Sequence, residues 1–100
     1  MTYEVIVLPK AKRQIRKIDA WWRENRPAAP TLFMAEFERA RARLGVFPDS
    51  GRRYSATVAD WRYLTLPATR YLLYYGIDAE KACVRILAIR SSRRDTQPRF

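Results

Sequence analysis

The sequence predicts an α+β domain with the element order β-α-α-β-β-β, in which a helical hairpin packs on one face of an antiparallel-rich sheet. The main observation is a change of period. Apolar residues recur at helical spacing up to Gly45 and at the spacing of strands after the turn-rich segment 48–51. Because 48% of the 100 residues are hydrophobic, we expect residues 1–100 to form a single domain with one core.

The first part of the chain predicts a strand and a long amphipathic helix. Residues 3–8 are rich in β-branched and aromatic side chains, and Pro9 suits the first turn of a helix that extends to about Arg26. The apolar stripe of this helix is Ala11, Ile15, Ile18 and Trp22. Its opposite side is basic, with Lys10, Lys12, Arg13, Arg16 and Lys17. Trp21 lies between the two sides, so we expect it at the edge of the core and partly exposed.

A second helix begins near Thr31, a suitable N-cap after the prolines at 27 and 30, and stops at Gly45. Its apolar stripe is Phe33, Phe37, Ala40 and Leu44. The short connection predicts an antiparallel hairpin, and both stripes need cover from the same sheet face. The other face of the sheet is therefore expected to be freer.

The second half of the chain predicts three strands over residues 61–66, 71–77 and 82–90, with a turn at 78–81 joining the last two. Residues 54–58 can add an extended piece. The tail, 91–100, has no periodicity and is expected to be an irregular arm. Cys83 lies in an apolar stretch and is expected to be a small buried side chain without a catalytic role.

The charge of the chain points to anionic partners. Twenty basic residues against ten acidic ones give a net charge of +10, and sixteen of the basic residues are arginines, which favour forked contacts to phosphates or carboxylates. Nucleic acid, ribonucleoprotein and an acidic protein all qualify. Because no apolar run approaches about 20 residues and no leader opens the chain, we expect a cytoplasmic protein that does not bind membranes.

The residue types exclude several chemistries. The chain has no histidine, which removes the commonest general base, the triads that depend on it and most zinc sites. Its acidic residues do not form the cluster of a two-metal nuclease, and its three glycines cannot make a phosphate-binding loop, so we expect no metal and no cofactor. What remains is a set of arginines and tyrosines at strand ends and in the tail: Arg62, Arg70, Tyr71, Tyr74, Tyr75, Arg90, Arg93 and Arg94.

Several segments in order resemble the RelE/ParE superfamily of toxins from type II toxin–antitoxin systems, which includes plasmid stabilisation proteins. They are the opening strand, the helical hairpin, the loop 47–51, and the segments TRYLLYY at 69–75, VRILAI at 84–89 and RSSRRD at 90–95. The last segment is similar to the end of ParE-like members. The resemblance implies a toxin neutralised in a hetero-oligomer by a ParD-like antitoxin with an acidic C-terminal segment, a partner that fits the +10 charge.

The resemblance leaves two activities open. RelE-like members cut messenger RNA on the ribosome, whereas ParE-like members bind DNA gyrase and are not nucleases. Arg70 and either Arg93 or Arg94 can fill the arginine roles of the nucleases, and Arg62 lies near where these often carry lysines. No Tyr follows Tyr75 to match their terminal Tyr or His. We therefore favour growth inhibition by binding gyrase. The alternatives are a metal-independent, ribosome-dependent endoribonuclease in which a strand tyrosine transfers the proton, and a non-toxic basic module that binds nucleic acid.

Candidate site residues follow from this interpretation, and none of them is confidently catalytic. The target-binding candidates are Arg93 and Arg94, supported by Arg70, Arg90 and Arg62. The antitoxin-binding candidates are Trp21, Trp22 and Arg16 on the first helix and Tyr74 on the sheet. For Arg70 a purely structural alternative is an ion pair with Asp60 or Asp78.

Overall fold

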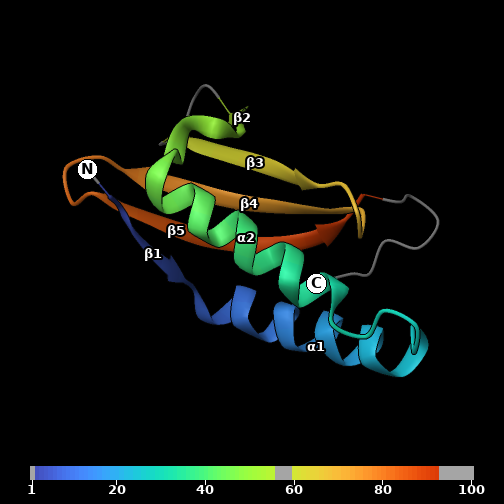
Figure 1. The fold of residues 1–100 in the computed structure, drawn as a ribbon. Coiled ribbons are helices and arrows are strands. Elements are labelled where there is room, and N and C mark those ends of the chain that lie inside the picture. Colours follow the sequence, from blue (N-terminus) through green and yellow to red (C-terminus); the bar gives the residue numbers. More distant parts are fainter. Residues whose placement is uncertain (1, 56–59, 93–100) are drawn as a thin grey trace.

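A computed structural model describes residues 2–55 and 60–92 (Figure 1). The elements follow in the order β1 (Glu4–Val7), α1 (Pro9–Asn25), α2 (Leu32–Val46), the 3-10 turn η1 (Pro48–Ser50), β2 (Arg52–Ser55), β3 (Trp61–Leu66), β4 (Tyr71–Asp78) and β5 (Cys83–Ser91). The predicted strands and helices are present with small shifts of their ends. The predicted tail falls mostly on residues outside the described ranges.

One five-stranded sheet in the order β1-β5-β4-β3-β2 forms the centre of the fold. The three pairings among β2, β3, β4 and β5 are antiparallel, and β1 alone is parallel to its neighbour, β5. The chain crosses from one edge of the sheet to the other through α1 and α2, which run in opposite directions (Figure 1). The α+β fold with an antiparallel-rich sheet is confirmed.

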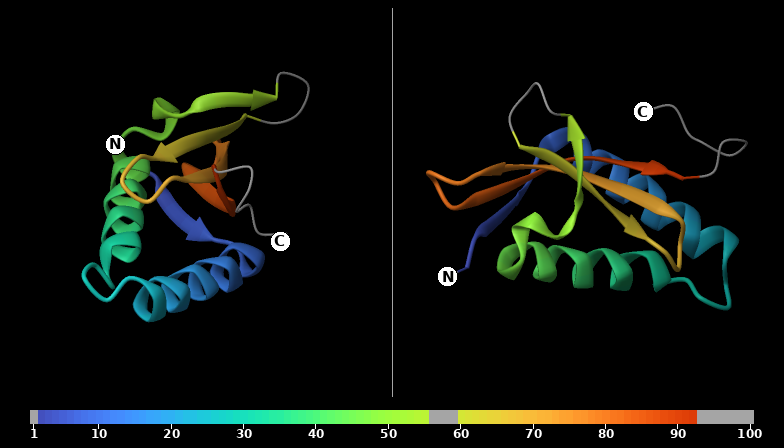
Figure 2. Two further views of the ribbon diagram at one scale, coloured as in Figure 1. Left: turned by 90° about the vertical axis from the view of Figure 1, so that its right-hand side faces the viewer. Right: turned by 90° about the horizontal axis from the view of Figure 1, so that it is seen from above.

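Helix α2 crosses one face of the sheet and α1 lies beside the edge formed by β1 and β5 (Figure 2). The core lies between the two helices and the sheet. Most of the predicted stripes are buried there, against alternate residues of β3, β4 and β5. The buried apolar residues are Ala11, Ile15, Ile18, Trp22, Phe33, Phe37, Leu44, Leu66, Leu73, Tyr75, Cys83, Val84, Ile86 and Ile89. Cys83 is thus buried as expected, and Ala40 packs at the edge of the core.

The end of α2 differs from the prediction, because the helix continues through Gly45 to Val46. The glycine has a packing role: the Tyr3 amide donates a 2.7 Å hydrogen bond to the Gly45 carbonyl, and a Cβ at position 45 would lie 3.3 Å from the Tyr3 carbonyl oxygen. Thr31 occupies the N-cap position of α2, but its side chain makes no capping bond. β2 begins at Arg52, two residues before the predicted extended piece, of which residues 56–58 lie outside the described ranges.

Beyond the end of β1, helix α1 lies along the edge of β5 and supplies a hydrogen-bond acceptor for its backbone. The last backbone bond at this edge runs from the Leu8 amide to the Ile86 carbonyl (3.1 Å), and the buried side chain of Gln14 then accepts the Ile89 amide at 2.8 Å. The Gln14 side chain thus gives the buried Ile89 amide an acceptor that it would otherwise lack. It also lets β5 extend to Ser91, which brings its end beside the turn between β3 and β4. Among the described residues no helix has the length and apolar content needed to cross a membrane.

Candidate functional site

The face of the sheet opposite the helices carries an aromatic cluster, formed by Tyr54, Trp61, Tyr63 and Tyr74. Their ring centroids are 6.2 Å apart for Tyr54 and Trp61, 5.3 Å for Tyr54 and Tyr74, and 5.9 Å for Tyr63 and Tyr74. The cluster spans β2, β3 and β4, and Figure 2 shows α2 on the opposite side of these strands. Alternation along the strands explains it, since the neighbours of these residues, such as Leu64 and Leu73, face the helices.

A hollow of about 310 Å³ lies beside this aromatic cluster. Its lining is Lys10, Tyr54, Trp61, Arg62, Tyr74, Leu87, Ala88 and Arg90. The pairing of β4 with β5 shifts between Tyr74 and Tyr75, so that Leu87 is an extra residue on β5. The walls of the hollow are aromatic and apolar, and two of its lining residues, Lys10 and Arg90, are exposed cations. Such a hollow suits a partner segment that offers a planar or apolar group next to a negative charge.

Arg62 is engaged in structure and is not a free cation. Its Nε donates to Asp60 Oδ1 at 2.9 Å, and its Nη1 donates to the carbonyls of Asp49 and Gly51 at 3.1 and 3.0 Å. The side chain is only 17% exposed. These bonds hold η1 and the start of β2 against β3, and they leave the guanidinium little capacity for a phosphate.

Of the three candidate strand tyrosines, Tyr75 belongs to the core and Tyr71 is half-buried against it. The Tyr75 hydroxyl donates to the Pro48 carbonyl at 2.7 Å and accepts the Gly51 amide at 2.8 Å, and burial raises the pKa of Tyr75. A Cβ on Gly51 would lie 2.5 Å from this hydroxyl, so glycine is required there. Tyr71 accepts a 3.2 Å bond from the Trp22 indole. Tyr74 alone of the three contributes to the hollow.

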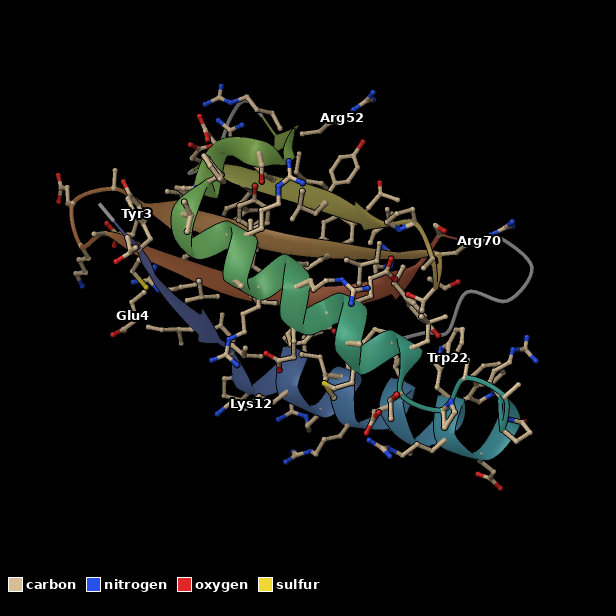
Figure 3. All side chains as sticks on the ribbon, in the orientation of Figure 1. Tyr3, Glu4, Lys12, Trp22, Arg52 and Arg70 are labelled. Carbon is tan, nitrogen blue, oxygen red and sulfur yellow. The ribbon has the colours of Figure 1, made fainter. Side chains whose placement is uncertain are left out.

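Arg70 is exposed on the turn between β3 and β4 and points away from the body of the molecule (Figure 3). The structural alternative for it does not hold: Asp60 pairs with Arg62 and Arg53, and Asp78 pairs with Arg85. The Arg70 carbonyl accepts both the amide and the hydroxyl of Ser92, at 2.9 and 2.8 Å. The predicted contacts Arg93 and Arg94 follow Ser92 directly and lie outside the described residues.

The antitoxin-binding candidates occupy three different places. Trp21 is 45% exposed at the end of α1, where the Arg26 guanidinium lies 5.2 Å from its ring centre, and Arg16 is exposed on the same helix. Tyr74 lies in the aromatic cluster on the open sheet face. Trp22 is buried under α1 and bonded to Tyr71, so it offers little surface to a partner.

Sequence reasoning missed several residues of this surface. Trp61 and Tyr63 were not candidates, but they share a sheet face with the candidate Tyr74. Strand alternation and the pairing of Tyr63 with Tyr74 explain this, and the pairing itself is not visible in the sequence. Lys10 was assigned only to the basic side of the helix. Within the described ranges no group of three or more His, Cys, Asp or Glu side chains is arranged to hold a metal ion.

Comparison with known proteins places this geometry in context. The family model described as ParE toxin of type II toxin–antitoxin system, parDE, matches residues 5–96. No curated protein matches the chain significantly. Among solved structures, the toxin–antitoxin complex RelBE2 from Mycobacterium tuberculosis is similar with a TM-score of 0.62 and 24% identity, covering 89% of this chain and 90% of that one.

Two further similar structures come from E. coli. The isolated RelE toxin has a TM-score of 0.55 and 18% identity, over 92% of this chain and 86% of that chain. The intact RelBE toxin–antitoxin complex has a TM-score of 0.54 and 18% identity, over 92% and 99%. At this level of identity the likeness establishes the fold, and the family model carries the assignment further.

Proposed function

Because the chain belongs to the ParE toxin family of type II toxin–antitoxin systems, we propose that it arrests bacterial growth by binding DNA gyrase. The observation that carries this proposal is the arginine-bearing end of the sheet, formed by Arg70, Arg90 and the start of the tail at Ser92. Arg70 is presented outward on a turn tied to Ser92, and Arg93 and Arg94 come next in the sequence. Several arginines at one end of a small domain suit a negatively charged docking surface.

The tyrosine environments favour binding over proton transfer. Cleavage of RNA without a metal needs groups that take and give a proton at the reacting phosphate. The Tyr71 hydroxyl accepts from the Trp22 indole, and the Tyr75 hydroxyl is bonded to Pro48 and Gly51. Burial raises the pKa of Tyr75, so less of it is ionised to act as a base at neutral pH. The chain also has no histidine to replace them.

The antitoxin is proposed to be ParD-like, with an acidic C-terminal segment. The net charge of +10 supports an acidic partner, and two of the similar structures contain a toxin with its antitoxin. The hollow beside the aromatic cluster, with Lys10 and Arg90 at its edge, suits a segment that alternates apolar and acidic side chains. Arg16 and Trp21 offer a second contact on α1.

The test compares induced expression of wild type with the Arg70→Ala/Arg93→Ala/Arg94→Ala variant. We expect wild type to arrest growth, and the purified protein to inhibit supercoiling by gyrase and increase its cleaved DNA complexes. The variant should lose both effects. A matched control removes the same charge from exposed positions on α2 through Arg39→Ala/Arg41→Ala/Arg43→Ala and should keep them. Unchanged gyrase activity with wild-type protein would end the gyrase proposal.

A second candidate is a RelE-like, ribosome-dependent endoribonuclease, favoured by one observation. Tyr74 lines the same hollow as Lys10 and Arg90, which brings a phenol near two cations that can hold a phosphate. This candidate predicts truncated messages only when translating ribosomes are present, and a loss of cleavage in Tyr74→Phe. Intact messages under those conditions would exclude it.

A further inference from the structure

A buried carboxylate on α2 holds the turn that presents Arg70. Glu36 is 7% exposed, although it lies on a helix whose other acid, Glu38, is in solvent. Its Oε2 accepts the Ala68 amide at 2.7 Å, and its Oε1 accepts the amide of Thr69 at 3.0 Å and also the Thr69 hydroxyl. Three donors from one turn therefore converge on one side chain 32 or 33 residues away.

The turn held in this way has an unfavourable backbone conformation. Arg70 has a φ of 64°, in the left-handed region that non-glycine residues rarely adopt. Its amide donates to the Leu66 carbonyl at 2.8 Å, which closes the turn. A conformation of this kind persists when the surrounding contacts fix it, and the bonds from Glu36 to the two preceding residues do so.

The same turn fixes the end of β5. The Arg70 carbonyl accepts two bonds from Ser92, and this residue directly precedes Arg93 and Arg94. Glu36 is thus connected to Ser92 by its hydrogen bonds to Ala68 and Thr69, the backbone from Thr69 to Arg70, and the two bonds between Arg70 and Ser92. An apolar side chain at position 36 would avoid the cost of burying a carboxylate, but it would leave the three donors of the turn without an acceptor, so the carboxylate serves to fix the turn.

We propose that Glu36 is a positioning residue for the arginine-bearing end of the sheet. It does not contact the target itself. It holds the turn so that Arg70 projects outward and Ser92 is tied beside it. The functional part of this proposal rests on the proposed role of Arg70, Arg93 and Arg94 in target binding.

The experiment is native-state hydrogen exchange on the full chain, followed residue by residue by NMR. Glu36→Gln keeps the size of the side chain but places an amide NH2 against a backbone N–H of the turn. We expect exchange at the Ser92 amide to become faster by on the order of tenfold, although its acceptor is Arg70 and not residue 36. The Gly51 amide, at the other end of the sheet, should keep its wild-type protection.

Tyr75→Phe is the matched control, because it removes a buried hydroxyl that bonds the Gly51 amide. It should speed exchange at Gly51 and leave Ser92 unchanged. Equal acceleration of both amides in Glu36→Gln, or an unchanged Ser92, would overturn the positioning role. If Glu36→Gln does not fold, Thr69→Val removes one of the three donors and is judged by the same two amides.

The functional part is read from affinity for gyrase and from growth arrest. Glu36→Gln is expected to bind gyrase about tenfold more weakly at an unchanged folded fraction, a loss of about 1.4 kcal/mol. Faster exchange at Ser92 with full affinity would overturn the functional part and leave the toxin assignment intact. If wild type itself fails to bind gyrase, the gyrase proposal fails, and the exchange data still decide whether Glu36 positions the turn.

Discussion

The two ends of the sheet are each anchored by one buried polar group, but the groups differ in kind. At one end the Glu36 carboxylate accepts three bonds from the turn between β3 and β4. At the other end the neutral Tyr75 hydroxyl donates to the Pro48 carbonyl and accepts the Gly51 amide. The neutral anchor joins η1 and β2 to the core, whereas the charged anchor holds the turn that presents Arg70.

The two anchors differ in what they cost to bury and in how many donors they gather. A phenol satisfies one acceptor and one donor at a low desolvation cost, which is sufficient to fix a loop. A carboxylate costs more to bury, but it can gather several N–H and O–H donors at one point and so specify a turn closely. The costlier anchor lies at the arginine-bearing end, for which target binding is proposed.

The largest expected effect comes from removing the charged anchor. Glu36→Ala leaves three donors of the turn without their acceptor, and we expect a loss of about 2–4 kcal/mol in the free energy of unfolding. Urea unfolding measures it. Glu38→Ala, two residues later on the exposed side of α2, is the control and should cost less than about 0.5 kcal/mol. Similar losses for both variants would contradict the role of Glu36 as an anchor.

Removing the neutral anchor is expected to have a smaller effect. Tyr75→Phe keeps the ring in the core but leaves the Pro48 carbonyl and the Gly51 amide without their partner, which should cost about 1–2 kcal/mol. Tyr74→Phe, on the open face, should change stability by less than about 0.5 kcal/mol. A Tyr75→Phe protein as stable as wild type would mean that the hydroxyl does not hold η1.

The neutral anchor also predicts a pH dependence at the alkaline side. Burial raises the pKa of Tyr75, so the unfolded chain releases this proton first, near pH 10, while the folded chain still holds it. The contribution of this group to stability is therefore constant below about pH 10 and is lost as the pH rises toward the folded pKa. Between pH 8 and pH 10.5 the urea midpoint should fall more for wild type than for Tyr75→Phe. Parallel falls would exclude this linkage.

The sequence was sufficient to predict the helices and strands, but not the two buried polar groups, Glu36 and Tyr75, that anchor the ends of the sheet. The helical stripes and the strand at 61–66 follow from local periodicity, and the buried side chains of Ile15, Phe33 and Phe37 agree with it. Glu36 gives no such signal, because an acid on a helix is typical of a solvent-facing position and its partners are more than thirty residues away. Its role depends on how the turn docks on α2, which only the tertiary structure determines.

The sites of target and antitoxin binding were harder still. Trp22 lies on the predicted apolar stripe but was still named with Trp21 as an antitoxin contact; its indole is buried and bonded to Tyr71, while that of Trp21 is exposed. Arg62 was grouped with Arg70 as a cation at a strand end, but contacts with Asp60 and two backbone carbonyls of the 49–51 segment engage it. Residue type and spacing identify possible contacts, and long-range pairing decides which of them remain free.

The smallest expected effect on stability comes from glycine substitutions in two turns, one at each end of the sheet. Arg70 and Ala82 both have left-handed φ angles, 64° and 47°, in the turns before β4 and β5. Glycine at either position relieves strain of about 1 kcal/mol, and part of this gain is offset by the greater freedom of glycine in the unfolded chain. Arg70→Gly and Ala82→Gly should therefore each shift the urea midpoint slightly upward.

The two glycine variants should differ in function even though their stabilities agree. Arg70→Gly removes a guanidinium from the arginine-bearing end, so growth arrest should weaken at undiminished stability, whereas Ala82→Gly should arrest growth like wild type. Titrating the inducer against growth rate measures both. Undiminished arrest by Arg70→Gly would mean that the turn matters only through its tie to Ser92, because glycine keeps the left-handed conformation and the backbone carbonyl that accepts from Ser92.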